Sequence, residues 1–108
     1  MFSRPKRQKQ VLIDQRILTI HRVIADKVMQ EPHLIEDARA VLQERYNNGM
    51  MRYGSFLLWE SILAYSNEPD MFKSLLLSED ARTASLRRST IFTGILTEEE
   101  RENALAQG

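Results

Sequence analysis

Hydrophobic residues recur at three- and four-residue intervals through the first half of the chain. The first run contains Ile13, Ile17, Ile20, Ile24 and Val28. The second run contains Leu34, Ile35, Ala38, Val41, Leu42 and Tyr46. This spacing places apolar side chains on one face of an α-helix. It predicts one helix over residues 11–29 and another over residues 33–47, packed together as a helical hairpin.

Residues typical of helix ends delimit these two helices and predict several more. Pro32 ends the first helix and can open the second, and Gly49 tolerates the left-handed conformation that often terminates a helix. Three further helices are expected to start at Ser55, Pro69 and Ser78, and Thr97-x-x-Glu100 has the pattern of a capping box that opens a last one. No segment shows the alternation of a β-strand. We therefore predict an all-α fold, a compact bundle of five or six helices with a long N-terminal helical hairpin and shorter C-terminal helices.

Composition supports a single globular domain. The chain has 108 residues, of which 43% are hydrophobic and 28% are charged, as is usual for soluble proteins. It has no cysteine, which excludes disulfides, thiolate metal sites and cysteine nucleophiles. Its longest apolar runs have four residues, against roughly 20 for a membrane span. We expect no membrane association and a cytoplasmic location.

Charge is spread unevenly although the net charge is zero. Residues 1–30 carry seven basic and two acidic side chains, whereas residues 31–108 carry eight basic and thirteen acidic ones. The basic excess starts with Arg4, Lys6, Arg7 and Lys9. We expect residues 1–9 to form a flexible basic N-terminal arm and residues 10–108 to form a single helical domain. The arm either contacts the phosphates of DNA or only improves solubility.

No pattern of catalytic or metal-binding residues is evident. The chain lacks a glycine-rich phosphate loop, HExxH and GxSxG. His21 and His33 have no matching ligand spacing and are expected at an edge or on the surface. Glu98, Glu99 and Glu100 are explained by the positive end of a helix dipole. We therefore expect a protein that is not an enzyme and needs no cofactor or metal.

Two segments are candidates for contact with another protein. The first is LRRSTIFTGILTEEER, residues 86–101, whose apolar residues Ile91, Phe92, Ile95 and Leu96 must be covered either by the domain's own core or by a partner. Arg87 and Arg88 at its start are expected to stay solvated and available to acidic groups of a partner.

The second segment is the loop before the third helix. Met50, Arg52 and Tyr53 are expected to stay outside and contact a partner, because methionine, arginine and tyrosine are frequent at interfaces. Trp59, in the following helix, is expected in the core.

Three motifs resemble a family of short, uncharacterised bacterial helical proteins. They are HRVIA at residues 21–25, WESIL at residues 59–63 and the segment at residues 86–101. The chain departs from the family pattern at Arg88, where a neutral polar residue is usual, and at Thr90 and Ile91, where Ser-Pro is usual. The resemblance implies an antitoxin-like role, since such proteins are often encoded beside nucleotidyltransferase-like or other toxin-type partners.

These observations favour a non-catalytic protein–protein interaction module, an antitoxin-like subunit that neutralises a partner protein by steric occlusion. The alternative is a small DNA-binding transcriptional regulator that uses the basic arm. A structural homodimer is a third interpretation.

Overall fold

The computed structural model describes residues 4–107, with the side chains of residues 9–106. Over these residues it contains six α-helices and no β-strand, which confirms the all-α fold. The helices are α1 (Arg4–Gln30), α2 (His33–Asn47), α3 (Tyr53–Leu63), α4 (Pro69–Leu76), α5 (Ala81–Arg88) and α6 (Glu98–Gln107). None of the described helices is both long enough and apolar enough to cross a bilayer.

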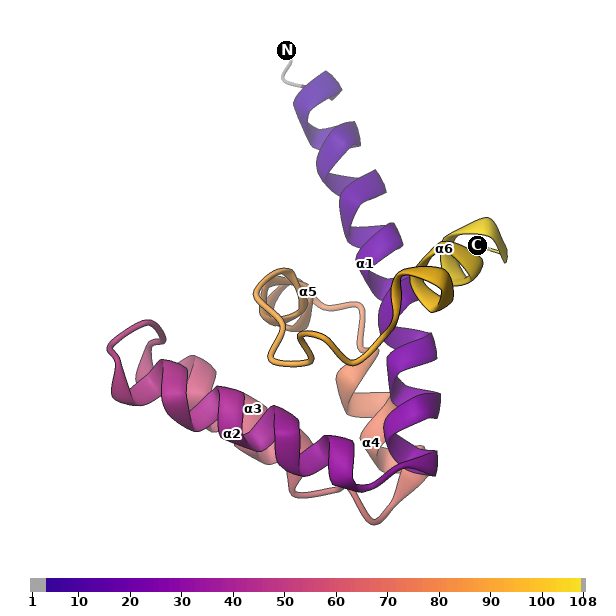
Figure 1. Ribbon diagram of the computed structural model, residues 1–108. Coiled ribbons are helices and arrows are strands. Elements are labelled where there is room, and N and C mark those ends of the chain that lie inside the picture. Colours follow the sequence, from indigo (N-terminus) through magenta and orange to yellow (C-terminus); the bar gives the residue numbers. More distant parts are fainter. Residues whose placement is uncertain (1–3, 108) are drawn as a thin grey trace.

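The helices form two groups that meet near the turn between α1 and α2. From this turn α1 and α2 diverge, whereas the sequence predicted that they pack together as a hairpin (Figure 1). α2 lies along α3, and the shorter helices α4, α5 and α6 contact α1. The two long helices diverge because later helices cover their apolar faces. α3 covers that of α2, and α4, α5 and α6 cover that of α1.

Several predicted helix ends are confirmed. Gly49 follows α2 with a positive φ of 73°, and Pro69 occupies the first turn of α4. The capping box is present, since the Thr97 amide donates to the Glu100 carboxylate at 2.8 Å and the Glu100 amide donates to the Thr97 hydroxyl at 3.1 Å.

Two predicted helix starts are wrong. α3 begins at Tyr53, two residues before Ser55, with Arg52 in an extended conformation as its N-cap. At α5 the cap is Asp80, whose carboxylate accepts from the Thr83 amide at 3.1 Å. The Ser78 hydroxyl instead donates to Asp80. A carboxylate two residues along thus takes the capping position that the serine was expected to fill.

The core joins both groups of helices, and Phe92 lies at its centre. The Phe92 ring meets the rings of Trp59 and Phe72 edge-on, at centroid distances of 5.9 and 6.4 Å. Trp59 is buried, as predicted, and Ile91, Phe92 and Ile95 are buried with it. The apolar part of residues 86–101 therefore belongs to the protein's own core.

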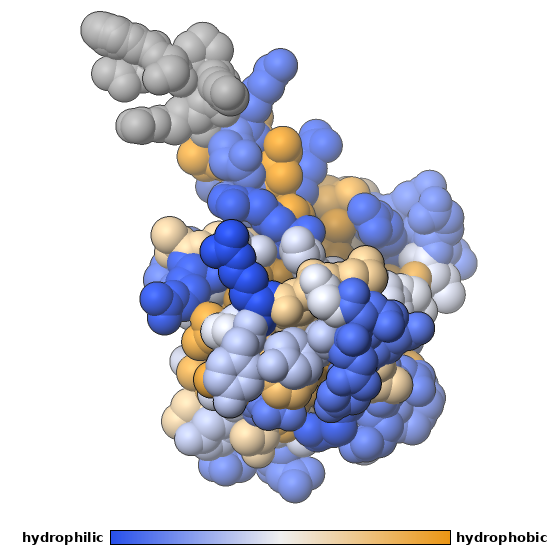
Figure 2. All heavy atoms as spheres, turned by 90° about the vertical axis from the view of Figure 1, so that its left-hand side faces the viewer, coloured by the Kyte–Doolittle hydropathy of each residue, from blue (hydrophilic) through white to orange (hydrophobic). Residues whose placement is uncertain are grey.

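The N-terminal half of α1 projects beyond this core. Val11, Leu12 and Ile13 are 51%, 60% and 50% exposed, and Figure 2 shows hydrophobic side chains among hydrophilic ones on the projecting part. The backbone is helical from Arg4 onward. The flexibility of residues 1–9 stays a prediction, because the side chains of residues 1–8 lie outside the described part of the chain.

Candidate functional site

The segment between α5 and α6 is held from α1 by His21. The His21 Nδ1–H donates to the Ile17 carbonyl at 2.8 Å, because a carbonyl can only accept. Nε2 then accepts from the Thr90 hydroxyl at 2.8 Å, and that hydroxyl accepts in turn from the Phe92 amide at 3.1 Å. The expected edge or surface position of His21 is wrong, since the residue is 2% exposed. Burial lowers the pKa of His21 to about 4, so the ring is neutral near pH 7.

Two cationic side chains hold the same segment through its carbonyl groups. Lys27 on α1 donates to the Ile95 carbonyl at 2.8 Å and to the Glu100 carboxylate at 2.7 Å. Arg45 on α2 donates to the carbonyls of residues 89 and 90 at 3.0 and 2.9 Å. These bonds satisfy main-chain acceptors that no helix or strand satisfies. Sequence reasoning missed both side chains, because neither lies in a recognisable motif.

Arg87 and Arg88 point to different environments. Arg87 is 3% exposed, and its Nη1 donates to the carbonyls of Leu76 and Ser78 at 2.8 and 2.7 Å. The prediction that Arg87 stays solvated is therefore wrong. A cation stabilises the C-terminal end of α4, where carbonyls lack partners within the helix. Arg88 is exposed, and its Nε and Nη2 donate to the Asp14 carboxylate on α1 at 2.9 and 2.8 Å.

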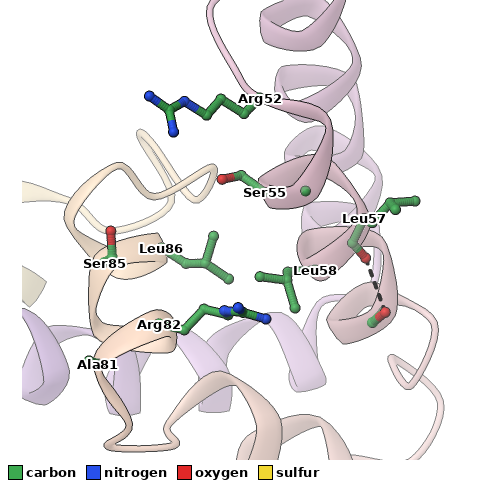
Figure 3. Close-up of a pocket in the computed structure, with 10 residues that line it drawn as sticks. Arg52, Ser55, Leu57, Leu58, Ala81, Arg82, Ser85 and Leu86 are labelled. Atoms are coloured by element: carbon green, nitrogen blue, oxygen red, sulfur yellow. Dashed lines mark hydrogen bonds between the residues drawn. The ribbon is translucent and has the colours of Figure 1, made fainter.

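A groove of about 700 Å³ lies between α3 and α5 (Figure 3). Leu58 of α3 and Leu86 of α5 point toward each other across it, and the Arg82 side chain extends from α5 toward α3 (Figure 3). Arg52 lies near the start of α3, and Ser55 also lines the groove. The groove thus combines an apolar floor with two guanidinium groups.

A second hollow of about 360 Å³ continues this groove toward the loop between α2 and α3. The two hollows share four lining residues, Arg52, Ser55, Ser85 and Leu86. Met50 lines the second hollow and is 72% exposed, and Tyr53 is 60% exposed. The exposure expected for the Met50–Arg52–Tyr53 loop is confirmed. We call the two hollows together the α3/α5 groove.

The other predicted site residues lie away from this groove. Arg88 pairs with α1, and Lys9 is exposed on the projecting end of α1. The side chains of Arg4, Lys6 and Arg7 lie outside those that the structure describes. His33 is exposed, as expected. Over the described residues, no group of three or more histidine or acidic side chains could hold a metal ion.

Comparison of the chain with protein-family models, with curated proteins and with solved structures gave no match. The resemblance carried by residues 21–25, 59–63 and 86–101 therefore stays an expectation.

Proposed function

We propose that this chain is a non-catalytic protein–protein interaction module of the bacterial cytoplasm that neutralises a toxin-type partner by steric occlusion. The supporting observation is the α3/α5 groove, an apolar hollow lined by three arginines, Arg45, Arg52 and Arg82, beside an exposed methionine and tyrosine. The helical body would cover the partner's active site while a segment of the partner fills the groove.

The chemistry of the groove defines the partner segment. Leu58 and Leu86 favour a large apolar side chain between them. Within the described part of the chain no carboxylate forms an ion pair with Arg52 or Arg82. Both guanidinium groups can thus donate two hydrogen bonds to a carboxylate, in the bidentate geometry typical of arginine. The groove therefore fits a segment that carries leucine or phenylalanine next to aspartate or glutamate.

The test measures binding to the protein encoded by the adjacent gene, with both proteins purified. Arg52→Glu and Arg82→Glu should each weaken the complex about tenfold or more, because both reverse charge beside the bound segment. Arg39→Glu is the matched control, since Arg39 is an exposed arginine on α2 that does not line the groove. Calorimetric titration that shows no complex, or an equal loss for all three variants, would reject the proposal.

A small DNA-binding regulator is the second candidate, and one observation favours it. α1 is helical from Arg4 and projects from the body, so its basic residues are placed on a helix that could reach a phosphate backbone (Figure 1). Lys9, Arg16 and Arg22 are exposed along it. Deleting residues 1–9 should then weaken DNA binding and flatten its dependence on salt. Salt-insensitive or undetectable DNA binding by the full chain would exclude this function.

A further inference from the structure

We propose that a cavity between α1 and the segment joining α5 to α6 binds a small amphipathic carboxylate, an organic acid with an apolar body. The cavity has a volume of about 380 Å³, within the range of roughly 300–1,000 Å³ typical of small-molecule sites. It shares no lining residue with either hollow of the α3/α5 groove. The inference is therefore independent of the proposed function.

The walls of the cavity suit an apolar body. Three isoleucines of α1, Ile17, Ile20 and Ile24, line one side, and Phe92 and Leu96 also line it. Ile17, Ile20 and Leu96 are only partly covered by the protein itself. An aliphatic chain in the cavity would remove more of this apolar surface from water.

Three guanidinium groups line the same cavity, and Arg87 is the most unusual of them. Within the described part of the chain no carboxylate forms an ion pair with Arg87, although it is 3% exposed. Its Nε is also buried without a hydrogen-bond partner among the described residues. Burial lowers the pKa of Arg87, and the carboxylates of Asp14, Asp80 and Glu79 offset only part of that effect from a distance. An anion bound nearby would therefore be stabilised by the charge of Arg87.

The other two arginines set the charge of the ligand. Arg88 already pairs with Asp14, whereas Arg101 is exposed at the cavity and forms no ion pair with a described residue. The Thr90 hydroxyl is engaged by His21 and by the Phe92 amide, whereas the Thr93 hydroxyl, which also lines the cavity, has no hydrogen-bond partner among the described residues. Two guanidinium groups without an ion pair among the described residues, together with five large apolar side chains, match one carboxylate on a hydrocarbon chain, with the carboxylate directed toward Arg101.

The experiment titrates the full-length protein with three probes. Octanoate has both the charge and the apolar chain, octanol has the chain alone, and inorganic phosphate has the charge alone. Octanoate should bind with an affinity about tenfold or more above that of either other probe, since a hydrogen bond to a charged group contributes about that factor. Intermolecular nuclear Overhauser effects from the octanoate chain to the Phe92 ring should locate it in the cavity.

Variants then test the assigned head-group contact. Arg101→Gln should weaken octanoate binding about tenfold while leaving the melting temperature unchanged, because Arg101 is exposed. Arg82→Gln is the matched control, an exposed arginine that lines only the α3/α5 groove, and should bind octanoate as the natural sequence does. Equal affinity for octanol and octanoate, stronger binding of phosphate, no octanoate binding, or an unchanged affinity in Arg101→Gln would each overturn the proposal.

Discussion

Two irregular segments of this molecule contain large apolar residues, but one is exposed to solvent and the other is buried. In the loop between α2 and α3, Met50 is 72% exposed. In the segment between α5 and α6, Ile91 and Phe92 are 0% and 3% exposed. Hydrophobicity alone does not separate the two segments, because both contain residues that burial would stabilise.

The difference lies in how their main-chain polar groups are satisfied. In the α2–α3 loop the Met50 amide donates to the nearby Arg45 carbonyl, a bond that stays within the end of α2. In the α5–α6 segment the carbonyls of Ser89, Thr90 and Ile95 accept from cationic side chains of α1 and α2. A segment without secondary structure can be buried only where such donors replace water.

The largest expected effect comes from removing the aromatic ring at the centre of the buried segment. Phe92→Ala should lower the free energy of unfolding by about 3–5 kcal/mol, because it leaves a cavity beside Trp59 and Phe72. Urea titration measures this loss. Tyr53→Ala, at the start of α3 directly after the exposed loop, is the comparison and should cost much less, since Tyr53 is 60% exposed. Equal losses for the two variants would contradict the assignment of Phe92 to the core.

The sequence supports prediction of the parts of this fold that depend on local patterns. The end of α2 at Gly49, the start of α4 at Pro69 and the capping box at Thr97 depend on residues close together in the chain. The hydrogen bonds between His21 and Thr90 and between Lys27 and Ile95 join residues 69 and 68 positions apart in the chain. No local pattern predicts them.

The candidate groove was predictable only in part, for the same reason. The sequence predicts Arg52 at a partner surface, because its loop contains interface-prone residues. Arg82 and Leu86 line it only because the tertiary fold places α5 across the groove from α3 (Figure 3). The predicted solvent exposure of Arg87 is wrong, since helix periodicity does not reveal that carbonyl groups at the end of α4 accept from its guanidinium group.

The pH dependence of stability should show how strongly His21 holds the buried segment. Its pKa falls from 6.5 to about 4 on folding, so between these values the unfolded chain binds more protons than the folded one. The contribution of neutral His21 to the free energy of unfolding is fully present above about pH 6.5. It should fall by about 3 kcal/mol as the pH drops to 4.

Urea titrations across this pH window measure the effect, with His21→Gln as the control. Glutamine cannot take up the proton, so the variant should be less stable at pH 7 and have a flatter profile between pH 4 and 6.5. A natural protein whose stability does not change over this range would show that His21 is not held neutral by burial.

A smaller effect is expected from the lysine that holds the Ile95 carbonyl. Lys27→Ala should lower the free energy of unfolding by about 1–2 kcal/mol, because it removes a charge-assisted hydrogen bond from a side chain that is 21% exposed. Lys73→Ala is the matched control. Lys73 pairs with Asp26 at 2.7 Å, but the two side chains are 40% and 62% exposed, so water compensates for their loss. Thermal unfolding of both variants should show the larger loss for Lys27, and the reverse order would mean that the carbonyl bond contributes little.

The smallest effect should come from the exposed loop itself. Met50→Ser should change the free energy of unfolding by no more than about 0.5 kcal/mol, the range of surface substitutions that break no special contact. The reason is the 72% exposure of Met50, which leaves little apolar surface for folding to remove from water. Urea titration is again the measurement, on the same scale as Phe92→Ala. A loss above about 1 kcal/mol would show that Met50 is covered in the folded protein. The two segments would then differ only in how far their apolar residues are buried, and the loop would not be a free surface beside the α3/α5 groove.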